Sequence, residues 1–208
     1  MPLIIDKIES GVKRFAVWQI EEEEEELMSL IDFTPELGKQ LKAIRDEGKR
    51  REWLASRILL NKLSGFSPSV SYNSYGQPYI KGRDCSISIT HTKNYAAVIL
   101  SDKDSVGIDI EYPSNRIKRV APRFLNMKEM EFAQKSSVAD DSLVYGLIWC
   151  AKEVLYKVAG MPGLAFREDI EVFSFELAKE GFIKARIKRR EEYLLRFLAE
   201  SDFYLVWY

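Results

Sequence analysis

The order of apolar and polar residues divides the first half of the chain into strand-like and helix-like segments. A short run of aromatic and branched residues at Arg14–Ile20 predicts a strand. From Pro35 to Leu63, apolar residues recur every three or four positions, which predicts helix, and Gly48 suggests a break into two helices. Isoleucine alternates with serine and threonine at the start of residues 85–102, and this alternation predicts a β-hairpin.

The second half shows the same kind of alternation. The segment "SVGIDIEY" at 105–112 predicts a strand, and two short helical patterns follow at about 115–125 and 128–134. The long apolar stretch that follows, 141–160, predicts a helix ended by Gly160. The remainder of the chain predicts mainly antiparallel strands.

Two segments resemble each other and indicate an internal duplication. "WLASRILLNKLSG", beginning at Trp53, and "WCAKEVLYKVAG", beginning at Trp149, share one register, in which Arg57 corresponds to Glu153. Each is followed by strands that end in aromatic and aliphatic residues. We therefore expect an α/β (α+β) fold of two duplicated lobes, 1–104 and 105–208, with a site in the cleft between them.

Composition narrows the classes of function. The net charge of −1 provides no overall field that would attract nucleic acid or a membrane surface. The chain has one histidine and two cysteines that form no C-x-x-C pair, so a zinc site is hard to assemble. No stretch is long and apolar enough for a membrane span. We expect a soluble, cytoplasmic protein with reduced thiols that binds neither nucleic acid nor membranes.

Carboxylates interrupt apolar segments in two places. Residues two apart on a strand point the same way, so Asp109 and Glu111 share a face. Residues four apart on a helix stack, which aligns Trp149, Glu153 and Lys157. Three carboxylates suit Mg²⁺, which also takes water and substrate phosphate as ligands. Taken alone, the helix pattern favours an exposed ion pair, and the strand pattern fits a solvated strand end as well as a metal site. Only the combination of the two patterns favours a metal site.

Basic residues and the single histidine indicate where an anion could bind. His91 lies between Thr90 and Thr92 at a predicted strand end, where its polar edge suits a phosphate or hydroxyl ligand, although a packed or surface histidine fits too. The acidic run Glu21–Glu26 favours a helix start over a patch that binds a metal or a basic partner. Eight basic residues either form a solvated helix face or bind a polyanion: Lys39, Lys42, Arg45, Lys49, Arg50, Arg51, Arg57 and Lys62.

Three blocks in order carry a resemblance to a known family: "GQPYI", then "SISITHT" followed by "VGIDIE", then "WCAKEVLYKVAG". Together they cover about residues 76 to 160. The chain resembles the 4′-phosphopantetheinyl transferases, in particular the two-lobed type that activates surfactin synthetase. Where the family has a lysine after the turn glycine, this chain has Gln77, which removes one cation. The family's Ser-His-Ser is here Thr-His-Thr, which keeps the hydroxyl groups.

The resemblance implies a pseudo-twofold α/β fold that binds coenzyme A and Mg²⁺ and acts as a monomer. It implies that Mg²⁺ is bound by Asp109, Glu111 and Glu153, and that Lys157 contacts the phosphates or the reacting groups. It also assigns contacts with coenzyme A to four residues of the first half, of which the first two would hold the 3′-phosphate end: Lys42, Arg51, Thr90 and His91.

The implied reaction is that of a holo-acyl-carrier-protein synthase. A serine hydroxyl of an apo acyl or peptidyl carrier protein attacks the β-phosphorus of coenzyme A, and 3′,5′-ADP leaves. We expect Glu153 to take the serine proton through a water, Lys157 to stabilise developing charge, and Asp109 to support them through the metal. Two alternatives remain: a non-catalytic module that binds coenzyme A or a carrier protein, and a metal-dependent phosphohydrolase.

Overall fold

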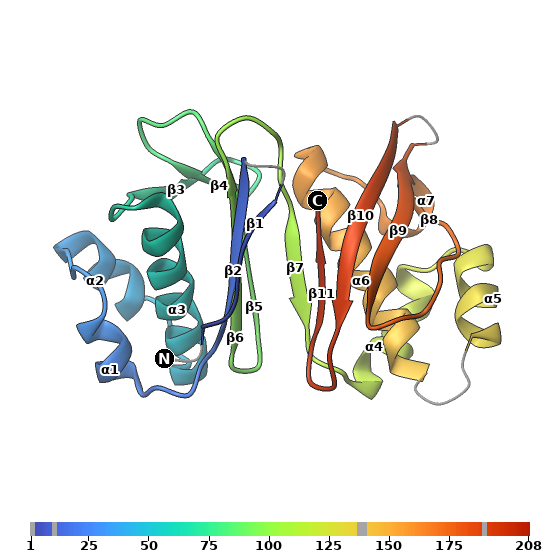
Figure 1. Ribbon diagram of the computed structural model, residues 1–208, viewed down its shortest axis with the longest axis horizontal. Helices are drawn as coiled ribbons and strands as arrows, with labels where there is room; N and C mark the ends of the chain where they lie inside the picture. Colours follow the sequence, from blue (N-terminus) through green and yellow to red (C-terminus); the bar gives the residue numbers. More distant parts are fainter. Residues whose placement is uncertain (1–2, 10–11, 137–140, 189–190) are drawn as a thin grey trace. The chain divides into compact units, whose positions relative to one another are not determined.

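A computed structural model describes residues 3–9, 12–136, 141–188 and 191–208. The chain divides into two compact units, Met1–Val106 and Gly107–Tyr208. The boundary expected near residue 104 lies two residues before this division. Each unit is a mixed α/β structure with a β-sheet and a long helix against it, which confirms the predicted fold class (Figure 1).

The N-terminal unit is built on a four-stranded antiparallel sheet in the order β1-β2-β6-β5. Its strands are β1 (Leu3–Glu9), β2 (Lys13–Gln19), β5 (Ser86–Thr92) and β6 (Tyr95–Ser101). Every residue of β6 is buried because it is an inner strand, with β2 and β5 as its neighbours. This is why it reads as a nearly continuous apolar run. The hairpin between β5 and β6 turns at Lys93 and Asn94, which both have positive φ as a tight two-residue turn requires.

Helices pack on this sheet, and the unit also contains a separate two-stranded hairpin. The helices are α1 (Glu24–Ser29), α2 (Pro35–Lys42) and α3 (Glu47–Ser64), and the hairpin pairs β3 (Val70–Tyr72) with β4 (Pro78–Ile80). The longest helix, α3, packs along β6, β2 and β5 (Figure 1). The predicted division into two helices is confirmed, but the break lies at residues 43–46 and not at Gly48. The helical stretch breaks before Asp46, whose carboxylate accepts from the Lys49 amide and starts α3.

The C-terminal unit contains a five-stranded antiparallel sheet in the order β7-β11-β10-β9-β8. Its strands are β7 (Ile108–Glu111), β8 (Ile170–Val172), β9 (Glu180–Ile187), β10 (Glu191–Ala199) and β11 (Tyr204–Trp207). The helical elements are α4 (Asn115–Val120), the short 3₁₀ helix η1 (Ala121–Arg123), α5 (Met127–Lys135), α6 (Asp141–Ala159) and α7 (Phe166–Asp169). The sequence analysis did not predict α7, because a single turn has too few residues to show a helical period.

The helix α6 forms the centre of this unit. It packs against the sheet strands β7 and β11 and also contacts α4 and α5. Because it has neighbours on several sides, it is apolar around most of its circumference, as its sequence indicates. It also carries the charged residues of the motif, so its packing fixes where they lie. Within the described residues, none of the helices has the length and apolar character needed to cross a membrane.

Candidate active site

The three predicted carboxylates lie close enough in the C-terminal unit for their charges to interact. Asp109 is buried on β7, and Lys157 of α6 donates from Nζ to Asp109 Oδ1 at 2.7 Å and to the Ile108 carbonyl at 2.9 Å. Glu153 lies one helical turn before Lys157, and the nearby charges of Asp109 and Glu111 both raise its pKa. The three carboxylates and one ammonium group have a net charge of −2 when all four are ionised. An excess of negative charge in a half-buried site suits a divalent cation.

Gly107 allows β7 to lie close enough to α6 to form this cluster. A Cβ atom at this position would lie 2.7 Å from the Val154 carbonyl oxygen and 2.8 Å from Cγ2 of Val158. The first of these atoms belongs to the helix backbone, which cannot move without disturbing α6. The glycine of "VGIDIE" is therefore required by close packing beside the carboxylates.

We predict that Gly107→Ala destabilises the protein by about 1–3 kcal/mol, because overpacking a close contact forces the backbone to shift. Thermal unfolding would measure the loss. Gly48→Ala is the matched control, because Gly48 lies in the first turn of α3 and a Cβ there would meet only a side-chain oxygen of Asp46 at 3.3 Å. That control should change stability much less, since alanine is the better helix former and the one crowded atom, the capping oxygen of Asp46, belongs to a side chain. Equal stability of both variants would contradict this account of Gly107.

The environment of Glu153 favours its neutral form. Burial, and then the charges of Asp109 and Glu111, raise its pKa from the ordinary 4.5 to about 7, and the ammonium of Lys157 only partly opposes this rise. The same cluster affects its neighbour Cys150, whose thiol has its pKa raised by complete burial and by Asp109 and Glu111. A carboxyl group with a pKa near neutrality can gain or lose a proton at physiological pH.

This raised pKa predicts how the stability of the metal-free protein depends on pH. A group that binds its proton more tightly when folded stabilises the fold below its unfolded pKa, and that contribution is lost as the pH rises through about 7. Glu153→Gln should remove this dependence, so that in EDTA the variant becomes more stable than the wild type at about pH 8 by up to about 3 kcal/mol. Denaturant unfolding from pH 5 to pH 8 would measure it, with the exposed Glu176→Gln as control. Parallel curves for all three proteins would contradict the prediction.

The donor set fits a hard divalent cation in its chemistry, because it consists of carboxylate oxygens whose mutual repulsion a cation would relieve. The side chains are not yet arranged around one point. Among the residues that the structure describes, no three His, Cys, Asp or Glu side chains form a ready-made metal site. Asp109 is instead bound to Lys157 at 2.7 Å.

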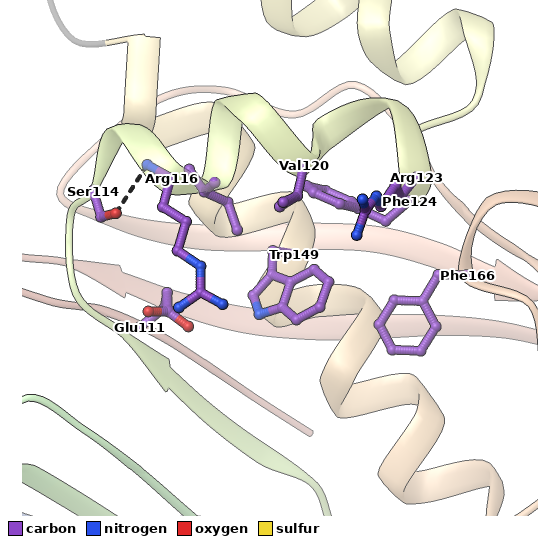
Figure 2. Close-up of a pocket in the computed structure, with 9 residues that line it drawn as sticks. Glu111, Ser114, Arg116, Val120, Arg123, Phe124, Trp149 and Phe166 are labelled. Carbon is purple, nitrogen blue, oxygen red and sulfur yellow. Dashed lines mark hydrogen bonds between the residues drawn. The ribbon is translucent and has the colours of Figure 1, made fainter.

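An apolar groove of about 510 Å³ begins beside Glu111. Figure 2 shows the Arg116 side chain reaching towards Glu111 and the Trp149 indole, with Phe166 further along the groove. The aromatic walls are in contact, with ring centroids 5.0 Å apart for Phe124 and Trp149 and 5.5 Å apart for Trp149 and Phe166. The groove is therefore charged beside Glu111 and Arg116 and mainly apolar elsewhere, with one further cation at Arg123. It suits a long group that carries little charge.

Comparison with known proteins assigns this unit to a family. Residues 105–205 match the model of the 4′-phosphopantetheinyl transferase superfamily. This part of the chain belongs to that superfamily. The match covers nearly all of the C-terminal unit and includes Asp109, Glu111, Glu153 and Lys157. The resemblance on which the sequence analysis relied is confirmed at this level.

Several 4′-phosphopantetheinyl transferases are similar to the chain over somewhat more than half its length. AcpT of Salmonella typhimurium is 28% identical over 115 residues, which is 54% of this chain and 60% of AcpT. AcpT of Escherichia coli is 30% identical over 120 residues, 55% of this chain and 60% of AcpT. HetI of Nostoc sp. is 26% identical over 136 residues, 59% of this chain and 57% of HetI. The aligned region thus spans less than two thirds of these relatives. They are AcpT and HetI proteins, and do not single out the surfactin-activating type.

The N-terminal unit places the other predicted residues in differing surroundings. Lys42 is exposed at the end of α2, and Arg51 on α3 contacts Glu23 Oε2 at 3.4 Å. Thr90 is buried on β5, whereas the next residue, His91, is exposed and contacts Glu52. Gln77, where the resemblance implies a lysine, accepts a hydrogen bond from the Asn73 side chain within the β3–β4 turn.

The acidic run Glu21–Glu26 forms ion pairs with basic residues of α3. Glu24 binds Arg50 at 2.7 Å, and Glu23 and Glu26 form the capping box that starts α1. The helix start favoured for the acidic run is therefore confirmed. Four of the eight basic residues are paired with carboxylates: Lys49, Arg50, Arg51 and Lys62. These pairs reduce the positive charge that this surface offers to a polyanion.

Sequence reasoning missed two buried charged residues of α3 and the walls of the groove. Arg57 is 3% exposed, lies over the Trp53 ring and donates to the Tyr72 hydroxyl. Its Nε has no hydrogen-bond partner among the described residues. Its correspondence with Glu153 in the internal repeat was the signal that could have found it. Glu52 had no such signal, because an acidic residue among Lys and Arg in a helix looks like part of a solvated surface.

Proposed function

We propose that this protein transfers the 4′-phosphopantetheine arm of coenzyme A to a serine of an apo acyl or peptidyl carrier protein. The observation that carries the proposal is the cluster of Asp109, Glu111, Glu153 and Lys157, in a domain of this superfamily. Glu111 of this cluster also lines the apolar groove. The names of the AcpT and HetI relatives support it. We also propose the surfactin-activating type and action as a cytoplasmic monomer.

Asp109, Glu111 and Glu153 are the proposed ligands of Mg²⁺. When bound there, the cation would neutralise negative charge on the pyrophosphate of coenzyme A. The groove lined by Trp149 and Phe166 suits the pantetheine arm, which is long and carries no charge. We further propose that His91, with Thr90, contacts a phosphate of coenzyme A, and that Lys42 and Arg51 contact the 3′-phosphate.

The reaction is a displacement at phosphorus. The serine oxygen of the carrier protein forms a bond to the β-phosphorus, the bond from that phosphorus to the bridging oxygen breaks, and 3′,5′-ADP leaves. The serine proton passes to Glu153 through a water. Lys157 stabilises the charge that develops on the phosphate oxygens, and its contact with Asp109 at 2.7 Å fixes it within the cluster.

Intact-mass spectrometry tests this function directly. An apo acyl carrier protein is incubated with the protein, coenzyme A and Mg²⁺, and we expect its mass to rise by one phosphopantetheine arm. EDTA should abolish the gain, and added Mg²⁺ should restore it. Several different apo carrier proteins are needed, because each pathway has its own carrier.

The two alternatives give other results in the same experiment. Binding of coenzyme A without a mass gain on any carrier would favour a non-catalytic binding module. Loss of coenzyme A in the absence of any carrier protein would favour a phosphohydrolase. Either result would contradict the proposed transferase.

A further inference from the structure

A buried carboxylate in the N-terminal unit holds the only histidine of the chain. Glu52, on α3, is 6% exposed, and its Oε2 lies 2.8 Å from Nδ1 of His91 on β5. The histidine itself is exposed. The contact therefore joins a buried acceptor to a side chain that faces solvent.

The charge of Glu52 is balanced from two sides. Burial opposes its ionisation, but hydrogen bonds from His91 and Lys49, the latter at 2.7 Å, outweigh burial and hold the pKa of Glu52 below its usual range. Glu52 is thus an ionised acceptor in the physiological range. The ammonium group of Lys49 balances the charge of Glu52, so the carboxylate adds no net negative charge that would repel an anion.

An ionised acceptor beside Nδ1 determines how the imidazole is used. The ring donates Nδ1–H to Glu52 whether it is neutral or protonated, so Nε2 is the nitrogen that remains for a ligand. Both residues stand on regular elements, since α3 packs along β5 and His91 precedes the tight turn at Lys93 and Asn94. The direction of the ring is therefore fixed by the scaffold.

We infer that Glu52 is a positioning residue, which holds the His91 ring so that Nε2 is presented to a phosphate of the bound ligand. The identity of this ligand as coenzyme A rests on the proposed function. The arrangement resembles that of metal-binding histidines, whose second ring nitrogen is commonly held by a carboxylate. A contact that only joined α3 to β5 would not need a buried charge, because apolar side chains do this at lower cost.

The first test uses the unmodified protein. Because the chain has a single histidine, its imidazole ¹⁵N signals need no assignment. At alkaline pH, where the ring is neutral, NMR should show the proton on Nδ1 and an unprotonated Nε2. A neutral ring with its proton on Nε2 would overturn the inference. This measurement does not depend on whether the protein transfers phosphopantetheine.

The second test compares variants by calorimetric binding of coenzyme A and of 3′,5′-ADP. Glu52→Gln should weaken both by about tenfold, as expected when a supporting carboxylate is lost, and should raise KM with little change in kcat. The loss should be no greater in Glu52→Gln with His91→Gln than in His91→Gln alone, because both changes act through the same ring. Additive losses would overturn the inference.

Controls separate this role from a general effect on folding. Lys49→Gln removes the other, more exposed partner of Glu52 and should leave the histidine tautomer unchanged. If Glu52→Gln does not fold, the His91→Gln variant still tests the inference. Unchanged affinity of His91→Gln for 3′,5′-ADP would show that the ring contacts no phosphate and would overturn the inference. A protein with the expected tautomer and nucleotide affinity but no transfer would contradict the proposed function and leave this inference standing.

Discussion

Glu153→Gln is expected to slow phosphopantetheine transfer by at least about 10²-fold, the size of effect that follows loss of a general base. Glutamine has the same shape but can neither accept the serine proton nor supply a charged ligand to Mg²⁺. The intact-mass assay, followed over time under single-turnover conditions, would measure the rate. Coenzyme A binding should persist, because the groove lined by Trp149 and Phe166 does not depend on the Glu153 charge.

Two comparisons make this result specific. The exposed Glu176→Gln should transfer at the wild-type rate. Glu153→Gln should also gain stability at about pH 8 in EDTA, because it removes a carboxylate whose pKa is raised to about 7 by its surroundings. An inactive variant that is more stable than the wild type cannot owe its inactivity to misfolding. Full activity in the variant would contradict the assignment of Glu153 as base and ligand.

Lys152→Met is expected to cost about 3–5 kcal/mol of stability, because it leaves a buried charge without its partner. Lys152 has no exposed surface, and its Nζ lies 2.7 Å from Glu129 Oε2. It also donates to the carbonyls of Phe124, Phe166 and Ile170 at 2.7–2.8 Å. Burial lowers the pKa of Lys152, while the adjacent Glu129 charge opposes that change and favours the ammonium form. All of these acceptors would lose their donor in the variant.

The partner of Lys152 connects this site to still more of the backbone. Glu129 accepts from the Val172 amide at 2.7 Å and from the Asn126 amide at 2.8 Å. Replacing both members of the pair by apolar residues would remove the hydrogen bonds that they make to these two amides and to the three carbonyls. We therefore expect Lys152→Met with Glu129→Leu to remain strongly destabilised, unlike buried pairs that apolar residues replace without loss.

Denaturant unfolding would measure these losses, and Lys135→Met provides a matched control. Lys135 also binds a glutamate at 2.7 Å, Glu131 on the same helix, but both side chains are largely exposed. An exposed pair of this kind contributes about 0.5 kcal/mol or less. Similar losses for Lys152→Met and Lys135→Met would show that burial adds nothing to the pair.

Lys152 also links stability to the groove. Its ammonium group holds the carbonyls of Phe124 and Phe166, whose rings form two of the aromatic walls. Lys152 directly precedes Glu153 on α6, and these two consecutive residues have different roles. Lys152 fixes the walls of the groove from within the core, and Glu153 contributes to the cluster beside it.

Much of the fold could be predicted because it follows from local periodicity. The strand at Arg14–Ile20 and the long helix ended by Gly160 appear at the expected places. Gly48 was misread because a glycine in the first turn of a helix looks the same in sequence as one that ends it. The capping side chain of Asp46, three residues before the amide it accepts from, was the better signal.

The sequence by itself determined which residues share a face. The two-residue period of a strand aligns Asp109 with Glu111, and the four-residue spacing of a helix aligns Glu153 with Lys157. Only the tertiary structure decided which charges are buried and what they bind. Lys152 meets Glu129 from another helix, and His91 meets Glu52 across the N-terminal unit. Burial depends on contacts between residues far apart in the chain. The adjacent residues Lys152 and Glu153 of α6 therefore differ: Lys152 belongs to the core and Glu153 to the site.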